Sequence, residues 1–351
     1  MKKSKRIIAL LVTVLTLASC EVEFSPNDRW SNIPVVYCLL DQDADTTYVR
    51  VQRCFLGEGN QYHYAANPDS INYPEGALTV LIEEWNTWVD NSGNFHPYGE
   101  SPRKTYNFQY AEIDGKDTGF FATSRHPVYW CQTGGQFDTN SIFRLKIVDN
   151  ATGDTIAKGE TRLIYGNLRL SSPNNVTHFQ FTGTAGSKTC DIRWSTITNA
   201  RQYQPMVRFF YRDFIVDRSS IPYDTTITNH YIDIPCNRVK SNMRDPYCST
   251  ILEQNTFLGE IKKQLEGDTC NKNVIDTVHV YIHCCTEDLA AYIYSSHPGG
   301  SLNQEPFTYT NMEGGLGIFA ARRTHIYFPI KTPLNSQSDY IRALKELGVG
   351  F

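Results

Sequence analysis

The sequence has few charged residues and no excess of basic ones. Only 20% of its 351 residues are charged, and the formal net charge is −4. Without the first 19 residues, which hold four basic and no acidic side chains, the net charge is −8. Nucleic-acid binding requires a basic patch, so this balance argues against a nucleic-acid partner. It also gives no sign of electrostatic attraction to an anionic membrane surface.

Long hydrophobic runs are scarce as well. The clearest run, Ile7–Leu17, is 11 residues long, whereas a transmembrane helix needs roughly 20. It follows four basic residues and precedes the small residues Ala18 and Ser19. A basic start, a short apolar core and small residues before a cleavage site indicate a secretory signal over residues 1–19.

Cys20 lies directly at the predicted cleavage site. The run Leu17-Ala18-Ser19-Cys20 resembles the bacterial lipobox, in which diacylglycerol alkylates the thiol and the cysteine becomes the mature N-terminus. An ordinary cleaved signal peptide is the alternative. Acyl chains contribute about 0.8 kcal/mol per buried methylene, so two or more of them anchor a protein stably. We expect lipidation of Cys20, a polar tether over residues 20–32, and a remaining chain that folds in water.

No motif in the sequence marks an enzyme. A G-x-S-x-G nucleophile elbow is absent, and the many Asp and Glu residues show no spacing typical of an acid–base pair. Such pairs can assemble from distant residues, so a glycan- or peptide-directed hydrolase remains an alternative. We predict no catalytic residue, no enzymatic activity and no cofactor.

Two spacings resemble metal motifs but fail on closer inspection. Asp41, Asp43 and Asp45 have the spacing that opens a calcium loop, but the sixth and twelfth positions hold Thr and Gln instead of Gly and Glu. His279 and His283 lie on a predicted strand, where about 13 Å separates residues i and i+4, too far for one metal ion. We therefore predict no metal site.

The segment 315–320 matches the dinucleotide pattern G-x-G-x-x-A. That motif requires a strand that ends where a helix begins. Here the flanking sequence is β-like on both sides, with Phe307-Thr308-Tyr309 before it and 325–330 after it. We interpret Gly315 and Gly317 as glycines at a strand bulge or crossover.

Nine cysteines remain besides Cys20, an odd number. An exported protein can form disulfides, and at least one thiol must then be free or paired between chains. Cys236 and Cys248 flank a polar loop and are the best candidates for a disulfide, and Cys270 with Cys284 or Cys285 is a weaker candidate. The alternative is that most cysteines are small buried hydrophobic residues.

The early part of the chain predicts a β-hairpin. Ile33–Leu40 is apolar and β-branched, and Thr46–Phe55 alternates between two faces, as half-buried strands do. The intervening turn would place Cys38 opposite Val49. A Cys38–Cys54 disulfide would break that register.

The composition predicts a mainly β protein, because aromatic residues reach 13% and Gly and Pro are scattered along the chain. The length suits two domains. We expect two immunoglobulin-like β-sandwich domains. The first has long loops over 57–76 and 86–104, and the second has short helices near 255–266 and 287–296. The expected bounds are 33–165 for the first sandwich, 166–335 for the second, and 336–351 for a C-terminal helix.

The predicted loop from Trp85 to Pro102 contains aromatic residues among Asn, Gly, Asp and Ser. Trp and Tyr on a polar loop suit stacking against a sugar or a protein interface. The alternative is a loop that folds its rings against its own sandwich. Our candidate binding residues are Trp85, Trp88, Phe95, Tyr98 and, with a weaker signal, Trp130.

Five short stretches read Asp, then Ser or Thr, then an apolar residue or Thr. They resemble the O-glycosylation signal of Bacteroidota envelope proteins, although Asp-Thr is also common where a turn meets a strand. We expect modification of Thr46 or Thr225.

The segment Thr310–Phe319, with the sequence TNMEGGLGIF, resembles the closing signature of a large family of Bacteroidota outer-membrane lipoproteins. The early hairpin and the segments Gly57-Glu58-Gly59 and Asn67–Ser70 are similar to that family too. The resemblance spans Pro34 to about Pro329 and implies a β-sandwich fold, an outer-membrane location and genetic association with TonB-dependent transporters. It implies no catalytic residue.

These observations predict a lipid-anchored outer-membrane or cell-surface protein that acts as a binding or accessory module. Its partner would be a glycan, a peptide or a TonB-dependent transporter, engaged through loops at one end of a sandwich. The alternatives are a structural envelope or adhesion protein without a small ligand, and the hydrolase named above.

Overall fold

A computed structural model gives the fold. It describes residues 32–55, 60–114, 119, 121–122, 126–184, 186–217, 219, 221, 224–242, 245–268, 270–296 and 309–348. The predicted signal segment, Cys20 and all of the tether except its last residue lie outside the described residues. Within the described part of the chain, no helix has the length and apolar character needed to cross a bilayer.

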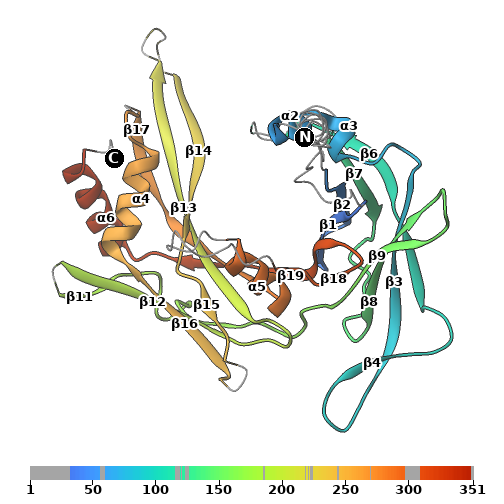
Figure 1. The fold of residues 1–351 in the computed structure, drawn as a ribbon. Coiled ribbons are helices and arrows are strands. Elements are labelled where there is room, and N and C mark those ends of the chain that lie inside the picture. The colour runs from blue at the N-terminus through green and yellow to red at the C-terminus, as the bar shows by residue number, and fades with distance from the viewer. Residues whose placement is uncertain are drawn as a thin grey trace, which may run out of the picture.

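The chain is mainly β, as predicted, and its described strands form three sheets (Figure 1). The largest sheet has nine strands in the order β14-β13-β17-β19-β1-β2-β7-β6, and β15 pairs with β13. It therefore joins strands from both halves of the sequence. Its strands are β1 (Pro34–Asp41), β2 (Thr46–Arg53), β6 (Gln109–Ile113), β7 (His126–Gln132), β13 (Gln202–Asp217), β14 (Asp224–Pro235), β15 (Val239–Lys240), β17 (Asn271–Cys285) and β19 (Leu316–Lys331).

The hairpin β1–β2 confirms the prediction from alternation. Cys38 lies opposite Val49 in the antiparallel register. Val36, Cys38 and Leu40 are buried, whereas their neighbours along β1 are half-buried. This is the period of two that a half-buried strand requires.

A six-stranded sheet packs against this hairpin. Its strand order is β18-β9-β8-β3-β4, and β5 pairs with β3. The predicted loop 86–104 is wrong, because β3 continues to Val89 and pairs with β4 to form a hairpin. The strands are β3 (Leu78–Val89), β4 (Phe95–Tyr98), β5 (Lys104–Asn107), β8 (Ile142–Asp149), β9 (Thr155–Arg162) and β18 (Met312–Glu313).

A third sheet and two helices cover the other end of the nine-stranded sheet. The sheet consists of β10 (Leu170–Ser172), β11 (Thr182–Thr184), β12 (Ser187–Ser195) and β16 (Tyr247–Glu253), and the helices are α4 (Gln254–Gln264) and α6 (Leu334–Glu346). Trp194, Tyr203, Phe257 and Tyr340 are fully buried between these layers. Their rings make close aromatic contacts at centroid distances of 5.7 Å.

Helices occur in both halves, which corrects the expectation that only the second half has them. The predicted loop 57–76 contains α2 (Gln61–Ala66) and α3 (Pro68–Ile71). Asn67 ends α2 and caps α3, because its Oδ1 accepts a hydrogen bond from the N–H of Asp69 at 3.0 Å. The predicted helices near 255–266 and 287–296 are confirmed as α4 and α5 (Glu287–Ser295), and α6 begins two residues before the predicted start at 336.

The C-terminal strands return to the N-terminal core, so residues 166–335 do not form a sandwich on their own. Met312 and Phe319 are buried among the side chains of the first half. β19 runs parallel to β1, with Gly317 opposite Val36. The Gly317 φ is +102°, and the residue lies inside a strand, which agrees with our interpretation of this glycine as a crossover residue.

The predicted Cys236–Cys248 disulfide is wrong in this structure. Both residues are free thiols. Cys236 and Cys248 are both 7% exposed and belong to the hydrophobic core that surrounds Trp194. Burial raises the pKa of Cys236 to about 12. They therefore act as small apolar side chains, the alternative that we kept open for most of the cysteines.

Candidate functional site

A polar groove follows β9, where the two halves of the molecule meet. Three adjoining cavities, of about 720, 520 and 440 Å³, all have Glu160 in their walls. The two larger cavities also share Arg162 and Asn199. We call these three cavities together the β9 groove.

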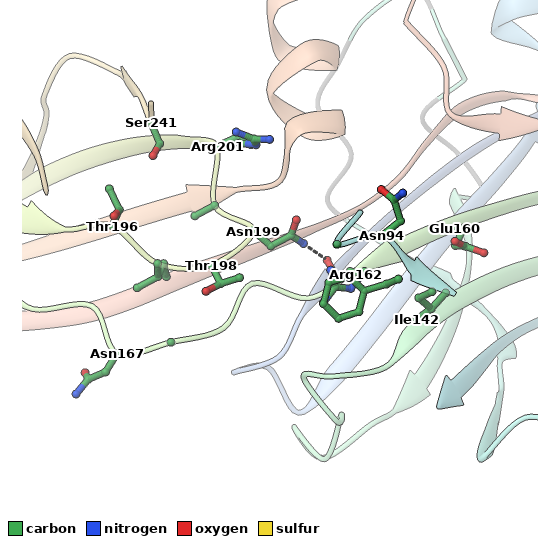
Figure 2. Close-up of a pocket in the computed structure, with 15 residues that line it drawn as sticks. Asn94, Ile142, Glu160, Arg162, Asn167, Thr196, Thr198, Asn199, Arg201 and Ser241 are labelled. Atoms are coloured by element: carbon green, nitrogen blue, oxygen red, sulfur yellow. Dashed lines mark hydrogen bonds between the residues drawn. The ribbon is translucent and has the colours of Figure 1, made fainter. Parts of the chain in front are cut away.

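The largest cavity lies between two loops that are far apart in sequence (Figure 2). One wall is the tip of the β3–β4 hairpin, including Asn94 and Phe95. The other wall is the loop between β12 and β13, residues 196–201. Asn199 connects this loop to β9, because its Nδ2 donates to the carbonyl oxygen of Arg162 at 2.9 Å. Its φ of +66° suits asparagine, which tolerates this conformation better than most residues.

The N-terminal turn of α5 forms the wall of the second cavity. Glu287 pairs with Arg201 at 3.3 Å. The hydroxyl of Tyr309 donates a hydrogen bond to Asp288. Burial is the first reason why the pKa of Tyr309 is raised, and the neighbouring Asp288 is the second. Carboxylates, a phenol and a guanidinium therefore meet at this end of the groove.

Arg162 is the most unusual residue in the groove. Its guanidinium carbon lies 3.1 Å from the ring centroid of Phe95. Burial lowers the pKa of Arg162, and Tyr165 opposes that shift. The guanidinium interacts with Tyr165, but its Nε and Nη2 are buried and have no hydrogen-bond acceptor among the described residues. Buried donors without acceptors cost about 1–3 kcal/mol each, so they call for an explanation.

The carboxylates along the groove are held by donors. Glu160 pairs with Arg144 at 2.9 Å, and Glu313 pairs with Lys158 at 3.0 Å. With the contacts of Glu287 and Asp288 described above, four acidic side chains of the groove wall thus each contact a donor. Such an arrangement holds polar groups in place for recognition and favours binding over acid–base chemistry.

The predicted aromatic residues do not form one platform, because the β3–β4 hairpin places them on opposite faces. Trp88 stacks on His96 at 4.7 Å and is 50% exposed, and Tyr98 is 67% exposed on the same face. Trp85 and Phe95 lie on the other face, within reach of Arg144 and Arg162 respectively. Of the four, only Phe95 contributes to the large cavity.

Trp130 belongs to a different sheet. It lies on β7, opposite Tyr48 on β2. No described contact connects it with the β9 groove. Of the groove residues, only Phe95 was predicted from the sequence. Glu160, Arg162 and Asn199 were not, since no local motif includes them.

The two candidate glycosylation sites lie on different strands. Thr46 is half-buried at the start of β2, and Thr225 is exposed on β14, opposite Val216. Neither lines the β9 groove. Modification of either residue stays a prediction.

The histidines of β17 predict a pH dependence of stability. Burial is the main reason why the pKa values of His279 and His283 are lowered, and Arg208 and Arg322 respectively add to this. Below a pH of about 6.5 the unfolded chain binds protons that the folded chain resists, so stability falls with pH in that range. We expect a lower Tm at pH 5.5 than at pH 7.5.

The control separates this effect from general acid denaturation. The His283→Gln variant should lose less Tm over the same pH interval, because one of the two half-buried imidazoles is gone. Substitution of the exposed His63 on α2 by Gln should leave the pH dependence unchanged. Equal pH profiles for all three proteins would contradict the prediction.

Comparisons with known proteins add little. No protein-family model matches this chain, and no curated protein matches it. Among solved structures, the chain is similar to the C-terminal globular domain of an oligosaccharyltransferase from Pyrococcus abyssi, with 8% identity and a TM-score of 0.21. The match covers 88% of this chain and 53% of that one, so this chain spans about half the length of its structural neighbour. At that TM-score the likeness supports no inference.

Proposed function

We propose that this chain is a lipid-anchored outer-membrane or cell-surface binding protein, and that the β9 groove holds a glycan. The anchor would be Cys20, whose surroundings resemble a lipobox. Mass spectrometry of the native N-terminal peptide tests the anchor directly. A TonB-dependent transporter is the proposed membrane partner, and this proposal is supported only by the resemblance of Thr310–Phe319 to the Bacteroidota lipoprotein family.

The observation that carries the ligand proposal is the pair of buried donor nitrogens of Arg162, Nε and Nη2, that have no acceptor among the described residues. Arg162 lies in the wall shared by the two larger cavities. A ligand that moves the Phe95 ring aside would supply those acceptors. Binding would then remove the free-energy cost of burying these donors without acceptors.

The chemistry of the walls favours a sugar over an apolar ligand. Asn94, Asn167, Thr198 and Asn199 present amides and hydroxyls to the large cavity, and Phe95 supplies an aromatic face. Planar polar side chains beside an aromatic ring match the hydroxyls and the apolar face of a sugar ring. The cation at Arg162 adds a preference for acidic sugars. Each engaged carboxylate then serves as a fixed hydrogen-bond acceptor.

The substitution Arg162→Met tests this proposal. Methionine keeps much of the apolar stem and removes the buried donors, but it also removes the contact of the guanidinium with Phe95. These effects oppose each other, so we expect the free energy of unfolding not to fall by more than about 1 kcal/mol. Affinity for the ligand should fall about tenfold or more, because hydrogen bonds to charged groups contribute roughly 1.5–3 kcal/mol. A panel of neutral and uronic-acid-containing oligosaccharides would be screened by thermal shift and then measured by calorimetry.

Arg193→Met is the matched control, because Arg193 is exposed on β12 and pairs only loosely with Asp191 at 3.6 Å. It should bind as the parent does. Equal affinity of the parent and the Arg162→Met variant would contradict the proposed site. Failure of the parent to bind any oligosaccharide of the panel would contradict the ligand class.

A further inference from the structure

Strand β14 is the longest strand at an edge of the described sheets. It has twelve residues and comes first in the strand order of the nine-stranded sheet (Figure 1). The strands at the other ends of the three sheets, β4, β6, β10, β11 and β18, have two to five residues. β13 pairs with one side of β14, and no strand among the described residues pairs with its other side. The N–H and C=O groups along that outer side are a template for another chain.

β14 lacks the features with which proteins usually protect an edge strand. Lysine, proline or a β-bulge at an edge prevents pairing with other chains. β14 contains no lysine or arginine, and its only proline, Pro235, is its last residue. Its register with β13 runs without a bulge from Met206–Pro235 to Asp217–Asp224. The strand is therefore regular enough to pair with a further strand along most of its length.

The exposed apolar side chains of β14 are arranged symmetrically about Asn229. Ile227 is 53% exposed and Tyr231 is 56% exposed. One precedes Asn229 by two residues and the other follows it by two residues. All three side chains lie on the same face of the sheet, because side chains alternate along a strand. This is the arrangement that a two-fold axis at Asn229 requires, since such an axis exchanges the two apolar positions.

The side chain of Tyr231 is held in place by its neighbours in the sheet. Its ring contacts the ring of Phe210 at a centroid distance of 6.4 Å, and the guanidinium carbon of Arg208 lies 3.9 Å from its centroid. Arg208 in turn pairs with Asp233 at 2.6 Å. A side chain that is already ordered loses less conformational entropy when it enters an interface.

We propose that β14 pairs with β14 of a second copy of this chain, in antiparallel orientation, about a two-fold axis at Asn229. In this register Ile227 of each copy lies opposite Tyr231 of the other, which gives two apolar cross-strand pairs. Asn229 is near the middle of the strand, so residues 225–233 of both copies pair. Main-chain hydrogen bonds then provide affinity, and the apolar pairs determine the register.

The charges of β14 fit the same register. Asp233 falls opposite Thr225, and His230 falls opposite Thr228. No other charged residue lies between 225 and 234, so no two like charges face each other. A different protein would need its own complementary strand, whereas a second copy brings the matching isoleucine and tyrosine by symmetry. The second copy is therefore the occupant that this edge fits.

This pairing would join two nine-stranded sheets into one continuous sheet. No residue of β14 contributes to the walls of the β9 groove. The inference thus depends neither on the proposed glycan nor on the proposed anchor.

Cysteine cross-linking tests both the pairing and its register. The full-length chain is produced in intact cells with Asn229→Cys, Ile227→Cys or Tyr231→Cys, oxidised with copper phenanthroline and separated on non-reducing gels. Cα atoms of directly opposite residues are about 4.5–5.5 Å apart, within the range of a disulfide. In the proposed register residue 229 lies opposite itself, whereas residues 227 of the two copies are about 13 Å apart along the strands. All three residues are exposed, so the variants should fold as the parent does.

We expect Asn229→Cys to form a covalent dimer well above the level of the parent. Ile227→Cys and Tyr231→Cys should each stay at the parent's level when produced alone and should form a mixed dimer when produced together. Addition of Ile227→Lys to Asn229→Cys should lower the dimer yield about threefold or more, because both apolar cross-strand pairs are lost. Ile251→Lys is the matched control and should not lower it, because Ile251 is 59% exposed on β16.

Three results would overturn the inference. The first is no dimer of Asn229→Cys above the parent's level. The second is an equal yield from all three single variants, or no mixed dimer of Ile227→Cys with Tyr231→Cys, since the register would then be wrong. The third is a cross-link from Asn229→Cys to a different protein, which would make that protein the occupant of the edge.

Discussion

Replacement of Gly317 by alanine is expected to prevent stable folding. A Cβ atom at this position would lie 2.0 Å from the carbonyl oxygen of Val36 on β1. The clash is with backbone in a parallel strand pair, so no side-chain rotation can relieve it. The φ of +102° adds strain for any residue with a side chain. We expect a loss of more than about 4 kcal/mol, a large part of the stability of a typical domain.

Urea denaturation followed by circular dichroism and tryptophan fluorescence would measure this loss. Gly153→Ala is the matched control, because its φ is +80° but no atom lies within 4 Å of the position of its Cβ. It should lose only about 1 kcal/mol, the cost of the backbone conformation alone. Equal stability of the two variants would show that the approach of β19 to β1 is looser than described.

Glu84→Ala is expected to have the second largest effect. Glu84 is 1% exposed, although it lies on a strand that alternates between apolar and polar residues. Its carboxylate accepts hydrogen bonds from the Tyr106 hydroxyl at 2.9 Å, the Ser141 hydroxyl at 3.2 Å and the backbone N–H of Asp138 at 3.2 Å. Arg103 also pairs with it, at 3.1 Å.

Removal of this carboxylate leaves several donors without an acceptor in the interior. Loss of one partner from a buried charged network costs about 3–5 kcal/mol, and we expect a decrease of this size in the free energy of unfolding. Glu313→Ala, which breaks the pair with Lys158 on the surface, should change stability little. A small loss for Glu84→Ala as well would mean that water replaces the carboxylate.

The predictable parts of the fold are those in which one local period decides the structure. In the hairpin at 33–55, the second strand alternates between two faces, and the register follows from the length of the turn. The helix at 255–266 has Phe257, Leu258 and Ile261 on one face, and all three are buried. In both cases the pattern of burial can be read within a short window of sequence.

The wrong predictions have a common cause. In each case, contacts between residues that are distant in sequence determine the structure. Residues 86–98 contain turn-forming Asn, Gly and Asp, which suggested a loop. Pairing between β3 and β4 instead makes most of this segment a hairpin and divides its aromatic residues between two faces. The domain boundary at 165 was wrong for a similar reason, since β19 joins both halves through its pairing with β1 and β17.

Little of the candidate site could be predicted from the sequence. Phe95 was selected as an aromatic residue on a polar loop, and it does line the groove. Arg162 ends a strand, and Asn199 lies 37 residues later in an ordinary turn. Neither residue belongs to a motif, because their association depends on how β9 and the β12–β13 loop pack.

The amino-acid sequence alone determined that this is a β-rich chain whose strands alternate between buried and exposed residues. The sequence also carries the short apolar segment and the cysteine on which the expected anchor depends. Those properties follow from side-chain period and composition, which act over a few residues. The tertiary structure alone decided that β19 crosses between the halves and that the β9 groove assembles around Arg162. Such features bring together residues separated by tens to hundreds of positions, and only packing of the whole chain determines those distances.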